Sequence, residues 1–399
     1  MNFRIKLIPW FSTFFLLVLC FPRNADALGK LILIQNVLEV LGIIWAAYIV
    51  ALHRGIINKK LLPMIMLLIW IYPCTIYNKG SLLKLIEITS RLICIVILSD
   101  FLIKRDCKRF ICNIASYWTV LMCLELFSYF TNCFGTVVIE NNMGRSEFLY
   151  LFGMKVEIDQ YVIYAIAFNM IAMLIGGLKE KIMLVTVVLS ALIFSLKTSA
   201  SASLMGMVIM LVFLVIGKFI ENKKIWTSIL ILIVIYACLF GFIGNTNMFI
   251  WLVDGILKEG VTLNGRTVIW EETLKLMTEW HLLFGYGFTP TYIIRLNDFF
   301  SVNHPHNQYL QSLFDFGYFG LILYLYIWMS QIKTIGTINN KGLRNIYIAT
   351  LVSNMVICIV SRNLLYGTAQ IFFVISIYMG RITKICNENK MKSIVKLNG

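Results

Sequence analysis

Two stretches decide how this chain is organised: residues 264–288, NGRTVIWEETLKLMTEWHLLFGYGF, and residues 304–320, HPHNQYLQSLFDFGYFG. They form the core of the longest segment too polar to lie in lipid, and they hold three of the chain's 4 histidines. The second stretch runs directly into an apolar segment. The pattern predicts a polar segment that membrane-spanning helices hold at a bilayer surface.

The rest of the chain has the composition of a membrane protein. Of its 399 residues 59% are hydrophobic and 14% are charged, and the mean hydropathy is +0.82. A soluble domain is nearer half apolar and a quarter charged. The apolar residues occur in runs of about 20, the length that a helix needs to cross roughly 30 Å of hydrocarbon. This composition excludes a soluble globular protein and indicates a polytopic membrane protein.

We predict an all-α fold with about twelve transmembrane helices. The expected spans are 5–22, 31–50, 61–78, 82–103, 110–130, 159–177, 182–196, 202–220, 225–244, 308–331, 345–362 and 366–383. No internal repeat or low-complexity linker divides the chain. We therefore expect a single integral membrane domain over residues 1–399, in which residues 245–307 form a large external loop with amphipathic helices.

The placement of charge predicts the orientation of these spans. If the N-terminus is cytoplasmic, every inside segment is basic and the short outside segments carry few cations, as the positive-inside rule requires. The inside cations include Arg4, Lys6, Arg54, Lys59, Lys60, Lys104, Arg105, Lys108, Arg109, Lys179, Lys181, Lys218, Lys223, Lys224, Lys333, Lys341, Arg344, Arg381 and Lys384. Both termini are then cytoplasmic and the 245–307 loop is external.

The net charge of +15 does not indicate a nucleic-acid partner. Its basic residues lie in short clusters between apolar runs, which is the orientation signal of an inner-membrane protein. The first apolar run resembles a signal peptide ending at Ala25-Asp26-Ala27. The alternation of charge nevertheless favours its retention as the first span.

The first of the two stretches has the pattern of an amphipathic helix at the membrane surface. Asn264 or Thr267 can cap it, and an apolar stripe beginning at Trp270 continues at helical spacing until Gly285 turns the chain. Arg266 lies at the helix N-terminus, where free amides and a guanidinium together make a good phosphate site. A solvated or snorkelling arginine is the alternative.

The second stretch places two histidines at the mouth of a span. His304 or His306 there can act as a general base, because the pKa of histidine lies near the working pH. Asn307 and Gln308 add hydrogen bonding that suits hydroxyl groups. The alternatives are a capping cluster or a metal site of His304, His306 and His281. H-x-H with one distant histidine matches zinc's convergent ligands weakly, so we expect no metal and no cofactor.

Three motifs in these stretches resemble the Wzy/O-antigen ligase superfamily. They are GRxxxW at Gly265–Trp270, FGYGF at Phe284–Phe288, and His306-Asn307 followed by nine residues and Gly317-x-x-Gly320. In that family the last pattern marks the end of the large external loop, and each of its fixed positions is matched. Gly317 and Gly320 also allow close helix packing if they share a helix face.

The resemblance implies a GT-C-like membrane glycosyltransferase that works without a metal. Such enzymes act at the outer face of the bacterial cytoplasmic membrane and pass a glycan from undecaprenyl pyrophosphate to an acceptor hydroxyl. His306 matches the family's essential histidine and Arg266 its loop arginine, with His304 as a further substrate contact. The implied partners are a carrier-linked oligosaccharide and membrane lipid, with a chain-length regulator and a flippase as further candidates.

Three other cations are candidates for substrate contact. Where the family often has a Ser-Arg motif, this chain reads SLK at 195–197, so Lys197 is the nearest cation, without the bidentate fork of arginine. Arg91 and Arg362 lie in or near spans, where charge is costly and usually faces a partner or a cavity. For Arg91 the alternative is neutralisation by Glu87 on the same helix face.

We predict a polysaccharide repeat-unit polymerase that transfers a glycan to the non-reducing-end hydroxyl of another carrier-linked unit. His306 is the base, and Arg266 with Lys197 binds pyrophosphate. The closest alternative is a ligase that moves the finished glycan to a lipid or wall acceptor, and the motifs do not separate the two. A transporter or flippase is a third reading, which the lack of internal repeats disfavours.

Overall fold

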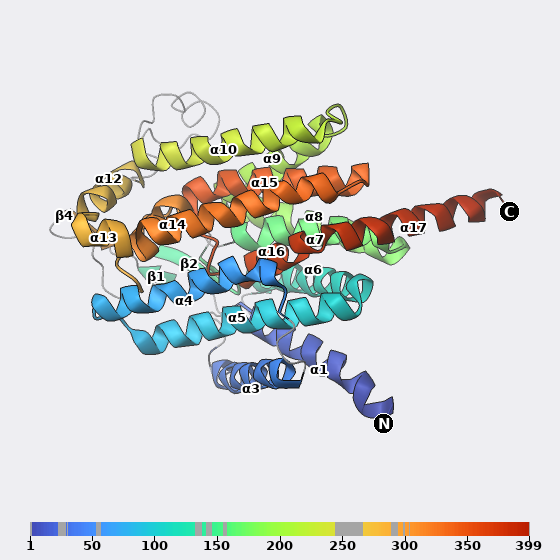
Figure 1. The fold of residues 1–399 in the computed structure, drawn as a ribbon, viewed down its shortest axis with the longest axis horizontal. Helices are drawn as coiled ribbons and strands as arrows, with labels where there is room; N and C mark the ends of the chain where they lie inside the picture. Colours follow the sequence, from blue (N-terminus) through green and yellow to red (C-terminus); the bar gives the residue numbers. More distant parts are fainter. Residues whose placement is uncertain are drawn as a thin grey trace.

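The apolar runs fold into long helices that lie roughly parallel in a bundle (Figure 1). A computed structural model describes residues 2–22, 29, 31–52, 57–131, 138–140, 146–154, 158–243, 266–288, 294–297, 300–302 and 304–398. Both chain ends lie at one end of the bundle, and α12 (Arg266–Leu276) and α13 (Glu279–Phe284) lie at the other. The polar stretch and the termini are thus at opposite ends, as the predicted topology requires.

Each predicted span except the last coincides with one helix, and the last covers α16 and the start of α17. The helices are α1 (Asn2–Cys20), α3 (Leu31–Leu52), α4 (Leu62–Tyr77), α5 (Leu82–Arg105), α6 (Cys107–Thr131), α7 (Asp159–Ile175), α8 (Leu178–Thr198), α9 (Ser201–Ile216), α10 (Lys223–Ile243), α14 (Gln308–Thr334), α15 (Lys341–Val360), α16 (Gly367–Ile377) and α17 (Met379–Asn398). The helical prediction is confirmed for the bundle.

Length and composition identify the helices that can cross a membrane. Among the residues that the structure describes, 6 helices are long and apolar enough, or up to 7 if α16 and α17 form one bent span. These helices make the chain a multi-pass membrane protein. A total of twelve crossings, and the assignment of each end to a side of the membrane, remain predictions.

The last expected span, 366–383, is not continuous. The axes of α16 and α17 differ by 71°, and Tyr378 between them has non-helical dihedral angles. At this bend the Tyr378 hydroxyl donates a hydrogen bond to Asp100 of α5. One turn later Arg381 donates to the carbonyls of Ile103 and Lys104, at 3.0 and 2.7 Å. Contacts with the end of α5 therefore stabilise the bend.

Burial separates the central helices from the peripheral ones. In the most apolar window of α15, 89% of residues are buried inside the protein, whereas in α3 the figure is 28%. α15 packs against α7, α9, α10 and α14, so its apolar surface is covered by protein. The apolar side chains of α3, such as Leu33 and Val37, are exposed. An exposed surface of this kind on a long apolar helix suits contact with lipid.

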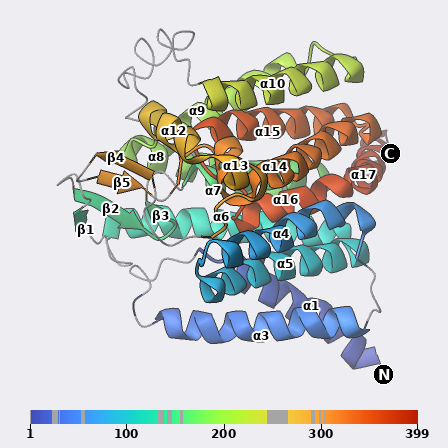
Figure 2. The same ribbon diagram turned by 60° about the vertical axis from the view of Figure 1, so that its left-hand side comes forward.

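Short strands occur in the two long loops, which the sequence did not predict. β1 (Val138–Glu140), β2 (Ser146–Tyr150) and β3 (Gly153–Met154) form an antiparallel sheet in the order β1-β2-β3, with Val138 opposite Phe148 and Leu149 opposite Met154. β4 (Ile294–Asn297) pairs with β5 (Phe300–Val302), with an irregularity between Arg295 and Asn297. Figure 2 shows the strands toward the end of the bundle that carries α12.

Candidate functional site

The two histidines of the HPH segment lie immediately before α14. Their ring centroids are 4.0 Å apart, and the ring planes are nearly perpendicular, at 81°. His306 has φ of +53°, a left-handed conformation that few residues other than glycine adopt. The segment is held from α12, because the Trp270 indole Nε1 donates to the Pro305 carbonyl at 2.8 Å. The conformation of His306 is thus fixed by a contact from the other polar stretch.

Two arginines shape the electrostatics of these histidines. Burial, followed by the positive charges of Arg362 and Arg266, lowers the pKa of His304 from 6.5 to about 3. For His306 the causes are burial, then His304, Arg266 and Arg362, and its pKa falls well below 6.5. A cation lowers the pKa of a neighbouring imidazole because it disfavours a second positive charge. Both rings are therefore neutral near pH 7 and lie beside two guanidinium groups.

Arg266 is the first residue of α12, the helix predicted for the first polar stretch. Trp270, one turn later, is fully buried, and Ile269 and Thr273 are buried on the same side. Glu271 on the other face is exposed. The predicted apolar stripe is therefore buried at Trp270 and Met277 but not at Trp280, which is 57% exposed.

The predicted helix divides in two before it reaches Gly285. α12 ends at Leu276, and α13 starts at Glu279 after Thr278 in an extended conformation. The carbonyl of Leu276 accepts a hydrogen bond from the Tyr286 hydroxyl at 2.9 Å, so a side chain from the following turn satisfies the end of α12. Thr267 lies inside α12 rather than before it, so its predicted capping role is wrong. Asn264 lies outside the described residues.

Asn307 and Gln308 are both buried and both have structural partners. The Asn307 Oδ1 accepts from the backbone amides of Tyr309 and Leu310 at 2.9 and 3.0 Å and so caps α14. The Gln308 Oε1 accepts from the amides of Asn363 and Leu364 at 2.7 and 2.9 Å. The capping cluster considered for this segment is therefore present.

The side-chain nitrogens of Asn307 and Gln308 differ in whether they have a hydrogen-bond partner. Gln308 Nε2 donates to the Ser312 hydroxyl at 3.2 Å, so both ends of the Gln308 amide are occupied. Asn307 Nδ2 is buried without a hydrogen-bond partner among the described residues. An unsatisfied buried donor is costly, so Asn307 is the better placed of the two to donate to a ligand.

Gln308 connects the histidine segment to the loop that carries Arg362. This loop, 361–366, joins α15 to α16, and Gln308 binds the two residues that follow Arg362. Asn363 Nδ2 donates to Asn354 Oδ1 at 2.6 Å, and the Ser361 hydroxyl accepts from Gln160 Nε2 at 3.0 Å. Buried hydrogen bonds thus hold Arg362 from both sides, next to the histidines.

The FGYGF segment packs into a break in α14. Gly317 has φ of +66° inside this helix and interrupts it. The carbonyls of Phe314 and Asp315, just before the break, accept hydrogen bonds from the backbone amides of Tyr286 and Gly287 at 2.7 and 2.9 Å. Two of the three family-like motifs therefore bind each other through their backbones.

This break corrects the prediction for Gly317 and Gly320. They do not share one continuous helical face, because Gly317 has a non-helical conformation. A Cβ atom at Gly317 would overlap the carbonyl of Leu283, and one at Gly320 would overlap the Phe316 side chain. The lack of a side chain at Gly317 thus lets Leu283 and Phe284 of the external stretch approach α14. It does not serve contact with another spanning helix.

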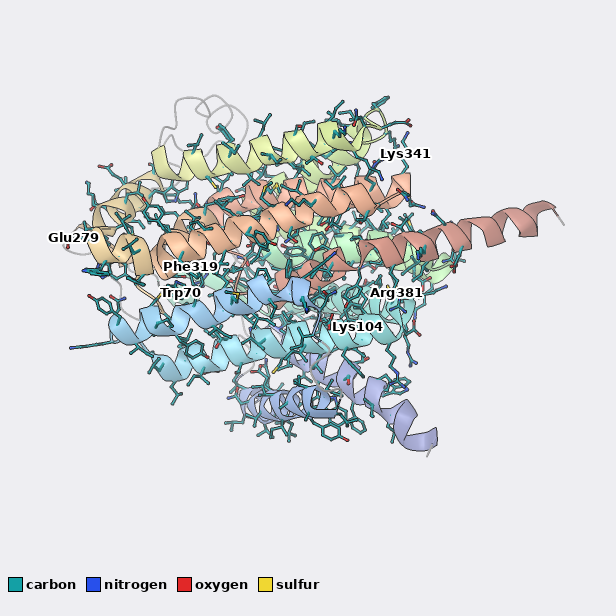
Figure 3. All side chains as sticks on the ribbon, in the orientation of Figure 1. Trp70, Lys104, Glu279, Phe319, Lys341 and Arg381 are labelled. Atoms are coloured by element: carbon teal, nitrogen blue, oxygen red, sulfur yellow. The ribbon has the colours of Figure 1, made fainter. Side chains whose placement is uncertain are left out.

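α4 supports the same junction. The Thr75 hydroxyl accepts from the Phe288 amide at 2.8 Å. The rings of Trp70 and Phe319, from α4 and α14, lie 4.4 Å apart at their centroids (Figure 3). Trp70 Nε1 also donates to the carbonyl of Phe316 at 3.0 Å. The external stretch is therefore fixed to the bundle on both sides of the helix break.

Lys197 and Arg91 do not join this cluster. Neither of them contributes to the electrostatic environment of His304 or His306 in the part of the chain that the structure describes. Lys197 is exposed near the C-terminal end of α8. Arg91 lies 3.8 Å from the carboxylate of Glu39 in α3, so it has an ion-pair partner on another helix. Their roles in substrate binding remain predictions.

The three histidines considered for a metal site do not converge. His281 stacks on Tyr286 with ring centroids 3.9 Å apart, and its Nε2 lies 3.1 Å from Asn78 Oδ1. Within the described residues, no group of three His, Cys, Asp or Glu side chains has an arrangement that could hold a metal ion. His281 therefore belongs to the α4 junction and not to the His304–His306 pair.

Two residues near the site were not singled out in the sequence. Trp270 was assigned only to an apolar stripe, and its hydrogen bond to Pro305 depends on the fold. Asp315 is buried in α14, accepts a hydrogen bond from Gln311 at 2.6 Å, and interacts electrostatically with Arg362. An acid within an apolar run is a signal that could have marked Asp315.

Together, the fold and this cluster define a multi-pass membrane protein with neutral histidines beside arginines at one end of its bundle. Residues 183–325 match the family model described as O-antigen ligase. The match runs from α8 into α14 and includes Arg266, His304 and His306, and it confirms the resemblance to the Wzy/O-antigen ligase superfamily. No curated protein and no solved structure matches the chain.

Proposed function

We propose that this protein is a lipid-carrier-dependent glycosyltransferase that polymerises polysaccharide repeat units at the outer face of a bacterial cytoplasmic membrane. The observation that carries the proposal is the grouping of His304 and His306 with Arg266 and Arg362, partly within the region that matches the O-antigen ligase family. The substrate would be an oligosaccharide on undecaprenyl pyrophosphate. A flippase that delivers it and a chain-length regulator are the proposed protein partners.

The proposed reaction is a displacement at the anomeric carbon of the carrier-linked glycan. The acceptor hydroxyl oxygen forms the new bond to this carbon, and the bond from the carbon to the pyrophosphate oxygen breaks. The leaving undecaprenyl pyrophosphate takes the bonding electron pair, and the hydroxyl proton passes to His306. General base catalysis of this type contributes about 10²–10⁴-fold.

The two arginines have the charge that such a leaving group needs. Guanidinium groups bind phosphate oxygens in a bidentate manner, and fixed cations stabilise the charge that develops as the bond breaks. Arg266 and Arg362 fill this role in our proposal, and they allow the reaction to proceed without a metal. Lys197 is a candidate for a more distant contact with the carrier.

A neutral imidazole suits the role of base. Burial and the arginines lower the pKa of His306 well below 6.5, so the ring has a free lone pair near pH 7. Asn307, with its unused Nδ2 donor, is the proposed contact for a sugar or phosphate oxygen. Gln308 becomes a residue that positions Arg362, because both its Oε1 and its Nε2 already have structural partners.

The test of transferase function is His306→Ala in the full-length protein with a carrier-linked repeat unit as substrate. We expect the rate of transfer to fall by about 10²–10⁴-fold while the protein still inserts into membranes. His281→Gln is the matched control, because His281 lies outside the pair, and it should retain transfer. A variant at His306 that keeps full activity would refute the proposal, and carrier translocation without glycosidic bond formation would support a transporter instead.

A ligase is the second candidate, and the description of the matching family favours it. It would use the same base and the same cations, since it must also activate a hydroxyl and release pyrophosphate. Incubation of the purified protein with carrier-linked units alone separates the two functions. A ladder of chain lengths supports the polymerase, whereas a single transfer that requires an added lipid or wall acceptor supports the ligase.

A further inference from the structure

A cavity of about 430 Å³ lies between α1, α5 and α6. Its lining includes Trp10 and Thr13 from α1, Arg105 at the end of α5, and Asp106, Arg109 and Asn113 around the start of α6. This end of α5 also carries Lys104, and Figure 3 shows Lys104 and Arg381 toward the end of the molecule that holds the termini. The cavity is therefore remote from the histidine pair.

An arginine and a tryptophan meet at this cavity. The guanidinium carbon of Arg109 lies 4.7 Å from the centroid of the Trp10 ring, a cation–π contact. Trp10 is 63% exposed, and Phe11 and Phe14 on the same helix are also exposed. Tryptophan is enriched at the boundary between hydrocarbon and water, so this pair marks the depth at which lipid phosphates lie.

The charges at the cavity favour an anion. The single acid, Asp106, accepts a hydrogen bond through Oδ1 from the backbone amide of Arg109 at 3.0 Å, so its carboxylate caps α6. Lys104 is already paired with Asp100, at 2.6 Å. The lining contains two cations, Arg105 and Arg109, and one anion, Asp106, so its net charge is +1.

A second cavity identifies the kind of anion. It has a volume of about 260 Å³ and shares Arg105 with the first. Its lining consists of the paired Asp100 and Lys104 and of apolar side chains that include Ile49, Val50, Ile97 and Phe101. A soluble phosphate compound would gain nothing from this apolar space. A phospholipid would place its phosphate at the arginines and an acyl chain against the aliphatic side chains.

We propose that these adjoining cavities bind an anionic phospholipid of the leaflet opposite the transferase site, with its phosphodiester held by Arg105 and Arg109. Basic pockets between spanning helices bind anionic headgroups in this way. The site is separate from the His304–His306 cluster and does not depend on the function proposed for that cluster.

The experiment measures lipid binding to the full-length protein in detergent by native mass spectrometry. The probes are phosphatidylglycerol, phosphatidylcholine with identical acyl chains, and glycerol 3-phosphate. We expect phosphatidylglycerol to bind most tightly. Each arginine-to-glutamine substitution should weaken it about fivefold, and Arg105→Gln with Arg109→Gln about 25-fold. Lys218→Gln with Lys224→Gln is the control, because it removes the same charge from exposed sites outside both cavities.

Three outcomes would overturn the assignment. Equal binding of phosphatidylglycerol and phosphatidylcholine would show that charge is not recognised. A double arginine variant with the affinity of the lysine control would show that the cavity is not the site. Displacement of phosphatidylglycerol by an equal concentration of glycerol 3-phosphate would assign the cavity to a soluble phosphate compound rather than a lipid.

Discussion

The two ends of the bundle carry similar cations in different surroundings. At the end with the termini, Lys341 forms an exposed ion pair with Glu221 at 2.6 Å, and Arg381 donates to backbone carbonyls (Figure 3). At the other end, burial lowers the pKa of His304 and His306, and the nearby charges of Arg266 and Arg362 lower it further. Water screens the exposed Lys341–Glu221 pair, whereas Arg266, Arg362 and the two histidines are partly buried, so their charges are screened less.

The largest expected effect comes from the arginines of the histidine end. Arg266→Gln and Arg362→Gln should each lower the rate of glycan transfer by about 10²–10³-fold, because each removes a cation from the leaving group. Lysine at either position should restore part of the rate, since it keeps the charge but loses the bidentate fork. The measurement is transfer from a carrier-linked substrate by purified protein.

Arg381→Gln is the control at the opposite end, and its rate of transfer should stay near that of the unmodified protein. Equal losses at Arg266 and Arg381 would remove the distinction between the two ends. They would indicate that the loss of any arginine lowers the rate of transfer, whatever its position in the bundle.

Two glycines give a second comparison: Gly317 in the break of α14, and Gly336 in the 3-10 helix (Ile335–Thr337) that follows α14. Gly317→Ala should lower the free energy of unfolding by about 1–3 kcal/mol through its left-handed φ alone, and more through overlap with the Leu283 carbonyl. At Gly336, a Cβ atom would have no neighbour within 4 Å, so Gly336→Ala is the matched control. Thermal unfolding in detergent measures both, and similar melting temperatures for the two variants would contradict the packing of the FGYGF segment into the break.

Two buried glutamines of α14 test how Arg362 is positioned. Gln308→Ala should reduce kcat about tenfold because it releases the 361–366 loop, whereas Gln331→Ala at the other end of the helix should not. Residues that act through one another give non-additive effects. In an Arg362→Gln background, Gln308→Ala should therefore cost little more. Fully additive losses would show that Gln308 acts independently of Arg362.

The last comparison concerns the two histidines themselves, whose lowered pKa values make stability depend on pH. The folded-state pKa values of His304 and His306 are lowered from 6.5, so the folded protein binds fewer protons than the unfolded chain between these values. Stability is then fully present above pH 6.5 and is lost as the pH falls, by at most about 1.4 kcal/mol per pH unit for each histidine. Melting temperatures between pH 7.5 and 5 should show this slope.

Replacing both histidines with glutamine should flatten the slope, because glutamine does not titrate in this range. An unchanged slope in the double variant would assign the effect to other groups. It would also mean that the pKa values of the two rings are not lowered as described.

The helices of the bundle could be predicted because the rule that selects them is local. A run of about 20 apolar residues folds as a helix whatever lies beside it, since its backbone must be satisfied internally in lipid. The interruptions at Gly317 and Tyr378 could not be predicted this way. Each depends on a partner distant in the sequence, the amide of Tyr286 in one case and the carboxylate of Asp100 in the other.

The site was predictable where a motif or a charge marked it. Arg266 and His306 followed from the family-like motifs, and Arg362 from the cost of charge near a membrane. Gln308 was expected to contact hydroxyl groups, but its amide binds the backbone of Asn363. Periodicity and composition contain no information on a contact between segments so far apart in the chain. For the same reason the hydrogen bond from Trp270 was missed.

The lowered proton affinity of the imidazole pair affects the protein between reaction cycles. Burial and repulsion from the two cations disfavour a proton on either ring, so the rings are weak acceptors. A bound diphosphate would cancel this repulsion and make the same rings stronger bases. In the transferase that we propose, the histidines would therefore not deprotonate water or lipid hydroxyls before substrate binds. The carrier-linked glycan would react only after the charge of its own diphosphate had raised the proton affinity of the base.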